Sequence, residues 1–82
     1  MEITKRNGMI EPYNRDKIVV AIQKSFASTG QEVTYATISS IVEEVESHVS
    51  SDVANRKVEQ IPDKVEQCLM EHGFYTEAKN YI

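Results

Sequence analysis

The stretch Ile3–Ile22, ITKRNGMIEPYNRDKIVVAI, constrains the fold most, because it places a strand turn directly before a helix start. Two runs that can pair as strands, Glu2–Arg6 and Met9–Tyr13, flank the dipeptide Asn7-Gly8. Both residues of this dipeptide tolerate positive φ, so it favours a tight hairpin turn. The chain is therefore expected to begin with a β-hairpin and to continue at once into a helix.

The remainder of the sequence has the periodicity of short helices. Asn14 suits the N-cap of the first helix and Thr34 that of the second, because their side-chain oxygens accept hydrogen bonds from unpaired backbone N–H groups. Pro62 is tolerated in the first turn of a third helix, which ends with Gly73 at C′. A last helical pattern runs over residues 76–82. The residues expected to face the core are Ile18, Ala21, Ile22, Ser25 and Phe26, then Ile38, Ile41, Val42, Val45 and Val49, then Ile61, Val65 and Leu69, and finally Tyr75, Ala78, Tyr81 and Ile82.

These elements predict a mainly α fold, a four-helix bundle covered at one end by an N-terminal β-hairpin. The length of 82 residues allows a single small domain, residues 1–82. Lys57-Val58 either adds a third edge strand to the hairpin or leads into the third helix. Because the helical pattern still continues at Ile82, we expect the chain to be one piece of a longer protein.

The charge is low but unevenly distributed. The net charge of −4 argues against a general nucleic-acid binder. Residues 1–24 nevertheless carry five Lys and Arg against three acids, whereas residues 25–82 carry four against ten. One cysteine suits a reducing compartment such as the cytoplasm, and the sequence has no signal-peptide pattern or membrane-length apolar run. The positive end coincides with the hairpin and the first helix start.

Four cations, Lys5, Arg6, Arg15 and Lys17, are expected to gather around a cleft between the hairpin and the first helix. A helix N-terminus there offers unpaired N–H groups and the positive end of the dipole, which suits phosphate. Such a site could hold a triphosphate, although no Gly-rich Walker loop is present. Taken alone, Lys5 and Arg6 fit a solvated strand face better than a binding site, and the nearby Arg15 and Lys17 beside a helix start are what favour the binding site.

Two neighbouring residues have open roles at this level. Tyr13 either plugs the core between hairpin and bundle or stacks on a base. Glu11 is either a salt-bridge partner of the nearby cations or an acceptor for an exocyclic amine or ribose hydroxyl.

A metal site is not favoured. Cys68 and His72 are four residues apart on one helix face, and His48 is a third possible ligand, but structural zinc sites usually have four ligands at tighter spacing. A buried thiol and a helix-ending imidazole fit these residues better. No spacing suggests nucleophilic catalysis, so the chain is expected to bind rather than catalyse.

Five segments together resemble the ATP-cone domain family. They are ITKRNG at Ile3–Gly8, EPYNRDKI at Glu11–Ile18, AI at Ala21–Ile22, VEQIPDKVEQCL at Val58–Leu69 and AKNYI at Ala78–Ile82. The match covers essentially the whole chain, in order and at the family's separations.

The resemblance implies a regulatory nucleotide-binding domain at the N-terminus of a ribonucleotide reductase large subunit. It implies a helical bundle capped by a three-stranded sheet, with ATP and dATP as allosteric effectors and Mg²⁺ held by their phosphates. The chain itself would be non-catalytic, within an oxidoreductase that makes deoxyribonucleotides for DNA synthesis. Expected partners are the adenine nucleotides and, in the parent enzyme, a second copy or the small or activating subunit, with no nucleic acid and no membrane.

By motif position, the resemblance assigns Lys5, Arg6 and Lys17 to the phosphates, and Glu11 and Tyr13 to the base or sugar. Ile18 and Ile22 would form an apolar floor under the adenine. The full expected set is Lys5, Arg6, Glu11, Pro12, Tyr13, Asn14, Arg15, Asp16, Lys17, Ile18, Ile22 and, through its backbone, Val58. Pro62 stands where the family often has a polar residue.

Two alternatives are weaker. A transcriptional repressor of reductase genes also carries this domain, but behind a zinc ribbon, and here Met1 directly precedes the hairpin without Cys-x-x-Cys pairs. A helical protein-interaction module would instead dock a basic partner on the acidic Val42–Val49 face and bind no nucleotide.

Overall fold

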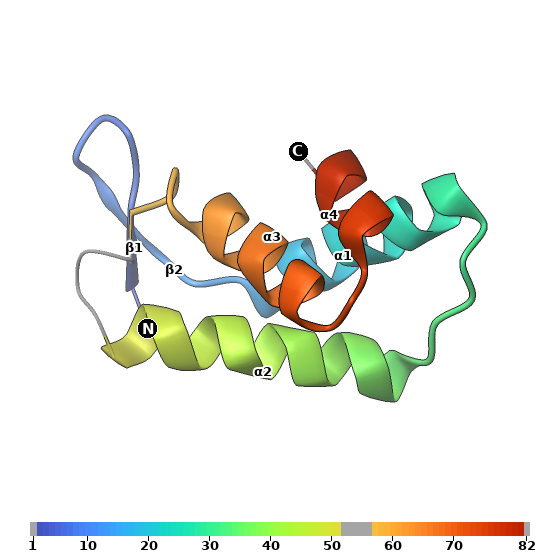
Figure 1. Ribbon diagram of the computed structural model, residues 1–82. Coiled ribbons are helices and arrows are strands. Elements are labelled where there is room, and N and C mark those ends of the chain that lie inside the picture. The colour runs from blue at the N-terminus through green and yellow to red at the C-terminus, as the bar shows by residue number, and fades with distance from the viewer. Residues whose placement is uncertain (1, 52–56, 82) are drawn as a thin grey trace.

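The computed structural model describes residues 2–51 and 57–81, which form four helices behind a small N-terminal hairpin (Figure 1). This confirms the mainly α fold predicted from the sequence. The elements are β1 (Glu2–Thr4), β2 (Ile10–Pro12), α1 (Arg15–Thr29), α2 (Tyr35–Ser51), α3 (Ile61–Glu71) and α4 (Tyr75–Tyr81).

The hairpin forms where predicted, with Thr4 opposite Ile10. The Gly8 N–H donates to the Lys5 carbonyl at 3.0 Å, and within the hairpin only Gly8 has positive φ, at 83°. Of the two residues that tolerate positive φ, the turn thus uses Gly8, which adopts this conformation without a Cβ clash.

The third strand of the expected sheet is reduced to one bridge within the described residues. Thr4 pairs in parallel with Lys57, and the Val58 N–H donates to the Thr4 carbonyl at 2.9 Å. The sheet thus has two antiparallel strands, and this bridge holds the segment before α3 beside β1. The contact brings residues far apart in sequence to one end of the molecule.

The predicted helix ends are confirmed by their caps. The Asn14 side chain accepts a hydrogen bond from the Asp16 N–H at 3.0 Å, and Thr34 Oγ1 accepts one from the Thr37 N–H at 3.2 Å. Gly73, with φ 86°, turns the chain out of α3. These caps satisfy backbone groups that the helices leave unpaired, and so they define where each helix begins or ends.

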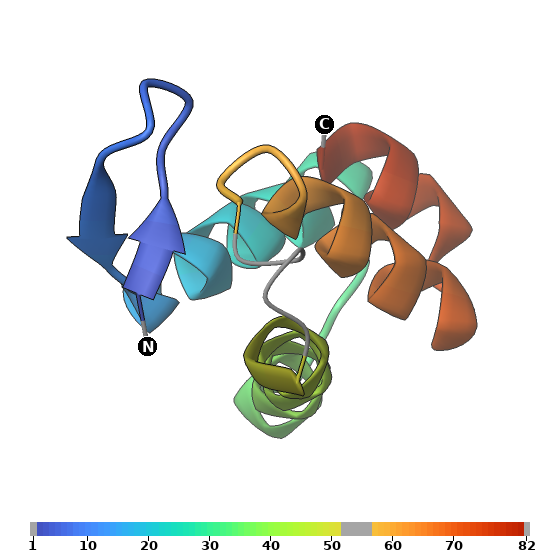
Figure 2. The same cartoon turned by 90° about the vertical axis from the view of Figure 1, so that its left-hand side faces the viewer.

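Each helix packs against two others, in the cyclic order α1, α2, α3, α4. Figure 2 looks nearly along α2 and shows the hairpin beside the first turns of α1, at one end of the helices. None of the helices in the described residues is long and apolar enough to span a bilayer. The residues that α2 buries are the five predicted: Ile38, Ile41, Val42, Val45 and Val49.

Two core predictions need correction. Val19 is buried, whereas Ala21 is only half-buried, so the inward face of α1 is rotated slightly from the predicted stripe. Tyr75 is exposed rather than in the core, because α4 begins at that residue and packs through Ala78. The Ser25 hydroxyl, buried between helices, donates to the Glu77 carbonyl at 2.8 Å and joins α1 to α4. The prediction for Ile82 falls outside the described residues.

Candidate functional site

A hollow of about 190 Å³ lies between the hairpin, the start of α1 and the start of α3. Its three sides meet because β2 runs directly into α1, while the Thr4–Lys57 bridge draws the segment before α3 to the same end. The residues that line it are Ile3, Glu11, Pro12, Tyr13, Asn14, Lys17, Ile18, Val58, Ile61 and Pro62.

The hollow combines an apolar floor with a few polar groups at its edge. Ile3, Ile18 and Ile61 are core residues that also line it. Glu11 and Lys17 supply opposite charges among the same lining residues. Binding sites for whole small ligands usually measure about 300–1,000 Å³. The hollow therefore suits one flat ring of a ligand whose remaining part lies on the adjoining surface.

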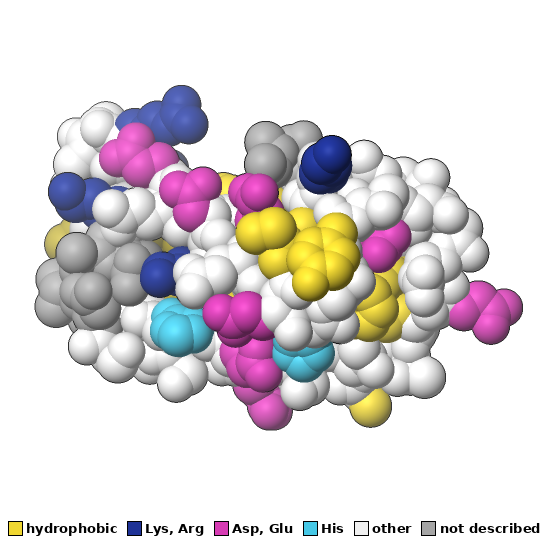
Figure 3. Space-filling view, in the orientation of Figure 1, with side chains coloured by type: hydrophobic (Ala, Val, Ile, Leu, Met, Phe, Trp, Pro, Cys, Tyr) yellow, Lys and Arg dark blue, Asp and Glu magenta, His cyan; other side chains and the backbone are white. Residues whose placement is uncertain are grey.

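That adjoining surface carries further cations. A shallow depression lined by Lys5, Arg6, Asn7 and Val58 shares Val58 with the hollow. Lys5 Nζ lies 3.6 Å from Glu11 Oε2, so the Lys5 ammonium is at the rim rather than on the far side of the molecule. Figure 3 shows basic side chains concentrated toward the hairpin end, and acidic side chains with histidine across the middle of that face.

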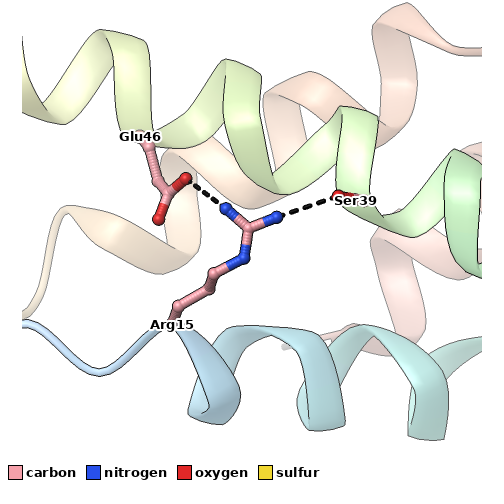
Figure 4. Close-up of polar contacts among 3 residues, drawn as sticks. All are labelled: Arg15, Ser39 and Glu46. Atoms are coloured by element: carbon pink, nitrogen blue, oxygen red, sulfur yellow. Dashed lines mark hydrogen bonds and ion pairs between the residues drawn. The ribbon is translucent and has the colours of Figure 1, made fainter.

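Arg15 is not brought to the hollow, although the sequence placed it among the phosphate-binding cations. Its guanidinium donates to Glu46 Oε1 at 2.6 Å and to Ser39 Oγ at 2.9 Å, both on α2 (Figure 4). The reason is helical geometry, since side chains two positions apart on a helix do not share a face. Lys17 faces the hollow, so Arg15 faces α2.

Three other residues of the expected binding set do not line the hollow, because they are too deeply buried or lie on another surface of the domain. Ile22 is fully buried one turn below Ile18 and does not line the hollow. Asp16 lines a separate shallow groove on α1, which Lys17 also borders. Arg6 borders the depression beside the hairpin turn.

Sequence reasoning did not select three residues that do line the hollow: Ile3, Ile61 and Pro62. Ile3 carries a usable signal, because alternation along a hairpin strand turns Ile3 inward between two outward neighbours. Ile61 and Pro62 arrive only through the bridge that ties the segment before α3 to β1, and no local pattern announces that contact.

Tyr13 combines the two roles that the sequence left open. Its ring packs against the core and also lines the hollow. Its hydroxyl is buried close to Glu46, without a hydrogen bond of ordinary length and angle to it. Burial, followed by the nearby Glu46 carboxylate, raises the pKa of Tyr13 well above its usual value.

Cys68 and His72 share the face of α3 that meets α2, as their spacing predicted. Cys68 Sγ and carboxylate oxygens of Glu44 and Glu71 lie within 4.8 Å of one another, and His72 Nε2 is 3.0 Å from Glu44 Oε2. Burial, reinforced by these two carboxylates, raises the pKa of the Cys68 thiol to about 11. In this structure the Cys68 side chain is part of the buried core between the helices.

The described residues thus form a small helical domain with a hairpin cap and a hollow between the cap and the helices. The model of the ATP cone domain family matches residues 1–82. The chain therefore belongs to the ATP-cone domain family.

Individual relatives agree with this assignment. The chain is 35% identical over 92 aligned positions to ribonucleoside-diphosphate reductase subunit alpha of Chlamydia muridarum, which covers 100% of the chain and 9% of the relative. It is 37% identical over 90 positions to the same subunit of Treponema pallidum, covering 100% of the chain and 10% of that relative. The transcriptional repressor NrdR of Leifsonia xyli is 32% identical over 56 positions, 68% of the chain and 34% of the repressor. The chain thus spans about a tenth of the reductase subunits that it matches.

Proposed function

We propose that this chain is a regulatory adenine-nucleotide-binding domain, in which ATP or dATP occupies the hollow under the hairpin. Membership of the ATP-cone family supports the ligand class. The observation that carries the proposal is the position of the hollow, which joins an apolar floor to a surface bearing Lys17 and Lys5. A purine ring needs an apolar floor, and a polyphosphate needs the lysine-bearing surface.

The base end of the nucleotide would lie in the hollow itself. Ile18 and Ile61 offer an apolar floor for the purine face, and Tyr13 forms a wall. Glu11 lines the same space with a carboxylate that accepts hydrogen bonds from an exocyclic amine or ribose hydroxyl. ATP and dATP differ in the 2′-hydroxyl, so a contact near the ribose is what allows the site to distinguish them.

The phosphates would lie across the first turn of α1 and the hairpin rim. Lys17 borders both the hollow and the groove beside it, so its ammonium can follow a phosphate chain out of the hollow. Lys5 approaches from the hairpin and would exchange part of its pairing with Glu11 for phosphate. Mg²⁺ would be held chiefly by phosphate oxygens and water, as it usually is in nucleotide sites.

The regulated protein would be the large subunit of a ribonucleotide reductase. Reductase alpha subunits match the whole chain, whereas the repressor matches 68% of it, which favours the reductase. The effector would shift activity by binding two assembly states with different affinity, whether through a second copy or the small or activating subunit. The chain supplies no catalytic group to this scheme.

Isothermal titration calorimetry with ATP, dATP and GTP tests the proposal. We expect ATP and dATP to bind, and GTP to bind more weakly because its exocyclic groups differ from those of adenine. Lys17→Ala and Lys5→Ala should each weaken ATP binding about tenfold, the loss of one charge-assisted contact. Lys79→Ala removes the same charge from an exposed position on α4 that does not line the hollow, and should leave the affinity unchanged.

Absence of heat with both adenine nucleotides at millimolar concentration, from protein with a folded circular dichroism spectrum, would contradict the proposal. That outcome would favour a docking module that uses the acidic side of α2. Equal loss of thermal stability in the Lys5 and Lys17 variants would mean that these side chains are structural.

A further inference from the structure

One wall of the hollow is connected to α2 by a part-buried polar cluster. Tyr13 lines the hollow with its ring, and its hydroxyl lies buried near the Glu46 carboxylate. Glu46 in turn accepts a hydrogen bond from the Arg15 guanidinium, which also donates to Ser39, about two turns away from Glu46 on α2 (Figure 4). The two helices meet through this cluster beside the site.

The cluster is arranged to orient side chains rather than to bind phosphate. The guanidinium uses one nitrogen on Glu46 and the other on Ser39, which restricts its rotation. The side chains of Arg15 and Glu46 are only 35% and 26% exposed, so solvent screens their pairing less than that of a surface pair. Without Arg15, Glu46 would be left as an unneutralised carboxylate against a buried hydroxyl.

We propose that Arg15 and Glu46 are positioning residues of the nucleotide site, which hold the Tyr13 ring as one wall of the hollow from the side of α2. This inference rests on the proposed function, because it takes the hollow as the place of the base. It assigns Arg15 a role at the base end of the ligand, by way of Tyr13, instead of direct phosphate contact.

The two roles predict different affinity patterns along a series of adenosine, ADP and ATP. A positioning residue acts on the part common to all three ligands, so Arg15→Ala should weaken each of them by the same factor, about tenfold. A phosphate ligand acts only where phosphate is present. Lys17→Ala should accordingly weaken ATP most and adenosine least.

Milder variants keep the test valid if Arg15→Ala fails to fold. Glu46→Gln keeps a hydrogen-bonding side chain but removes the charge, and should weaken all three ligands about threefold. Arg15→Lys keeps the charge, and should recover part of the lost affinity. Tyr13→Phe removes the hydroxyl that faces Glu46, so adding Glu46→Gln to it should cause little further loss if the two residues act together.

A measurement without ligand tests the contact itself. The surroundings of Tyr13 can be followed at neutral pH by NMR with ring-labelled tyrosine, the Tyr13→Phe variant providing the assignment. The charged or titratable groups that act on Tyr13 are Glu46 from α2, Arg15 from α1 and Tyr81 from α4. Glu46→Gln and Arg15→Ala should each shift the Tyr13 ring signals, because each substitution removes a charge that acts on the Tyr13 hydroxyl.

The outcomes separate the inference from the proposed function. A uniform loss over the ligand series, with the expected Tyr13 shifts, supports the positioning role. If Arg15→Ala weakens only ATP and ADP, the positioning role is overturned. It is also overturned if the folded Arg15 variant loses no affinity, although Lys17→Ala still weakens ATP binding in it. In both cases the proposed nucleotide binding stands. If the unmodified chain binds no nucleotide, the proposed function fails, and with it the positioning role for that ligand. Tyr13 ring signals that Glu46→Gln leaves unmoved would also overturn the contact.

Discussion

The hairpin cap and the helical core of this domain are built in opposite ways. In the hairpin, residues 2–12, only Ile3 is buried, whereas α2 alone buries five apolar side chains. The cap is held by two three-residue strands and one bridge, and it forms one side of the candidate site. The buried core thus lies mainly in the helices, whereas the candidate site lies where the cap meets the starts of α1 and α3. Functional elements are commonly drawn from the less stable parts of a fold.

The sharpest test of this separation removes volume from the core. Leu69 is fully buried, so Leu69→Ala should lower the free energy of unfolding by about 2–5 kcal/mol through lost burial and a residual cavity. Urea denaturation measures the loss. Where the variant remains folded at low temperature, its affinity for ATP should be unchanged.

Ile41→Val is a milder control at another fully buried position, and should lower the free energy of unfolding by about 0.5–1.5 kcal/mol. A marked loss of ATP affinity in either folded variant would break the comparison, because it would show that core packing shapes the site.

The next effect concerns pH and belongs to the core. Because burial raises the pKa of Cys68 from 9.0 to about 11, the folded chain retains a proton that the unfolded chain loses in that range. The free energy of unfolding should therefore fall as pH rises from about 9 to 11, by an amount on the order of 2 kcal/mol for this group. Denaturation over this pH range measures it.

Tyr13 and Tyr81, whose pKa values burial also raises, add to the same trend at the upper end. Cys68→Ala isolates the thiol, since this variant should lose the part of the slope that begins near pH 9 while keeping the tyrosine part. An identical slope in the variant and the parent would show that the thiol is not protected by folding.

Asn14 tests the boundary between the two regions, because it caps α1 and also lines the hollow. Asn14→Ala should lower the free energy of unfolding by about 1 kcal/mol, the usual effect of losing an N-cap, and should also weaken ATP binding. Thermal denaturation and calorimetry on the same sample measure both. Asn14→Asp keeps the cap acceptor and should retain stability while placing a negative charge beside the phosphates. Unchanged binding in both variants would mean that Asn14 serves the helix alone.

The smallest expected effect on stability lies wholly in the cap. Glu11→Gln removes the carboxylate that Lys5 approaches at 3.6 Å, a half-exposed ion pair. Such pairs contribute about 0–1 kcal/mol, so the unfolding midpoint should move little and the small change should vanish in high salt. Nucleotide affinity, and in particular the preference between ATP and dATP, should change more. A large fall in stability would show that the cap contributes more to the fold than its burial suggests.

Local sequence signals were sufficient for much of the fold. The five buried positions of α2 follow from apolar spacing, and the start of α1 follows from an N-cap that needs only its own first turn. Gly73 likewise ends α3 because the left-handed conformation there suits a residue without Cβ. Each of these features depends on neighbours within a few residues.

The candidate site was only partly predictable. Residues 11–14 with Lys17 and Ile18 could be selected because they lie close together in sequence at a strand-to-helix junction. Ile61 and Pro62 could not, because a bridge between Thr4 and Lys57 brings them there. The sequence also did not show which of Lys17 and Arg15 faces the hollow, since a cation that can pair with phosphate can equally pair with the carboxylate of Glu46.

The sequence by itself determined the order of the elements, their caps and the face that α2 buries, because periodicity and capping act over one or two turns of chain. Only the tertiary structure decided which cations face the hollow, what forms its floor and how Tyr13 is supported from α2. Those outcomes depend on how helices distant in the chain are rotated and paired. The side-chain pattern of one helix does not show which charged residue of a neighbouring helix it will face.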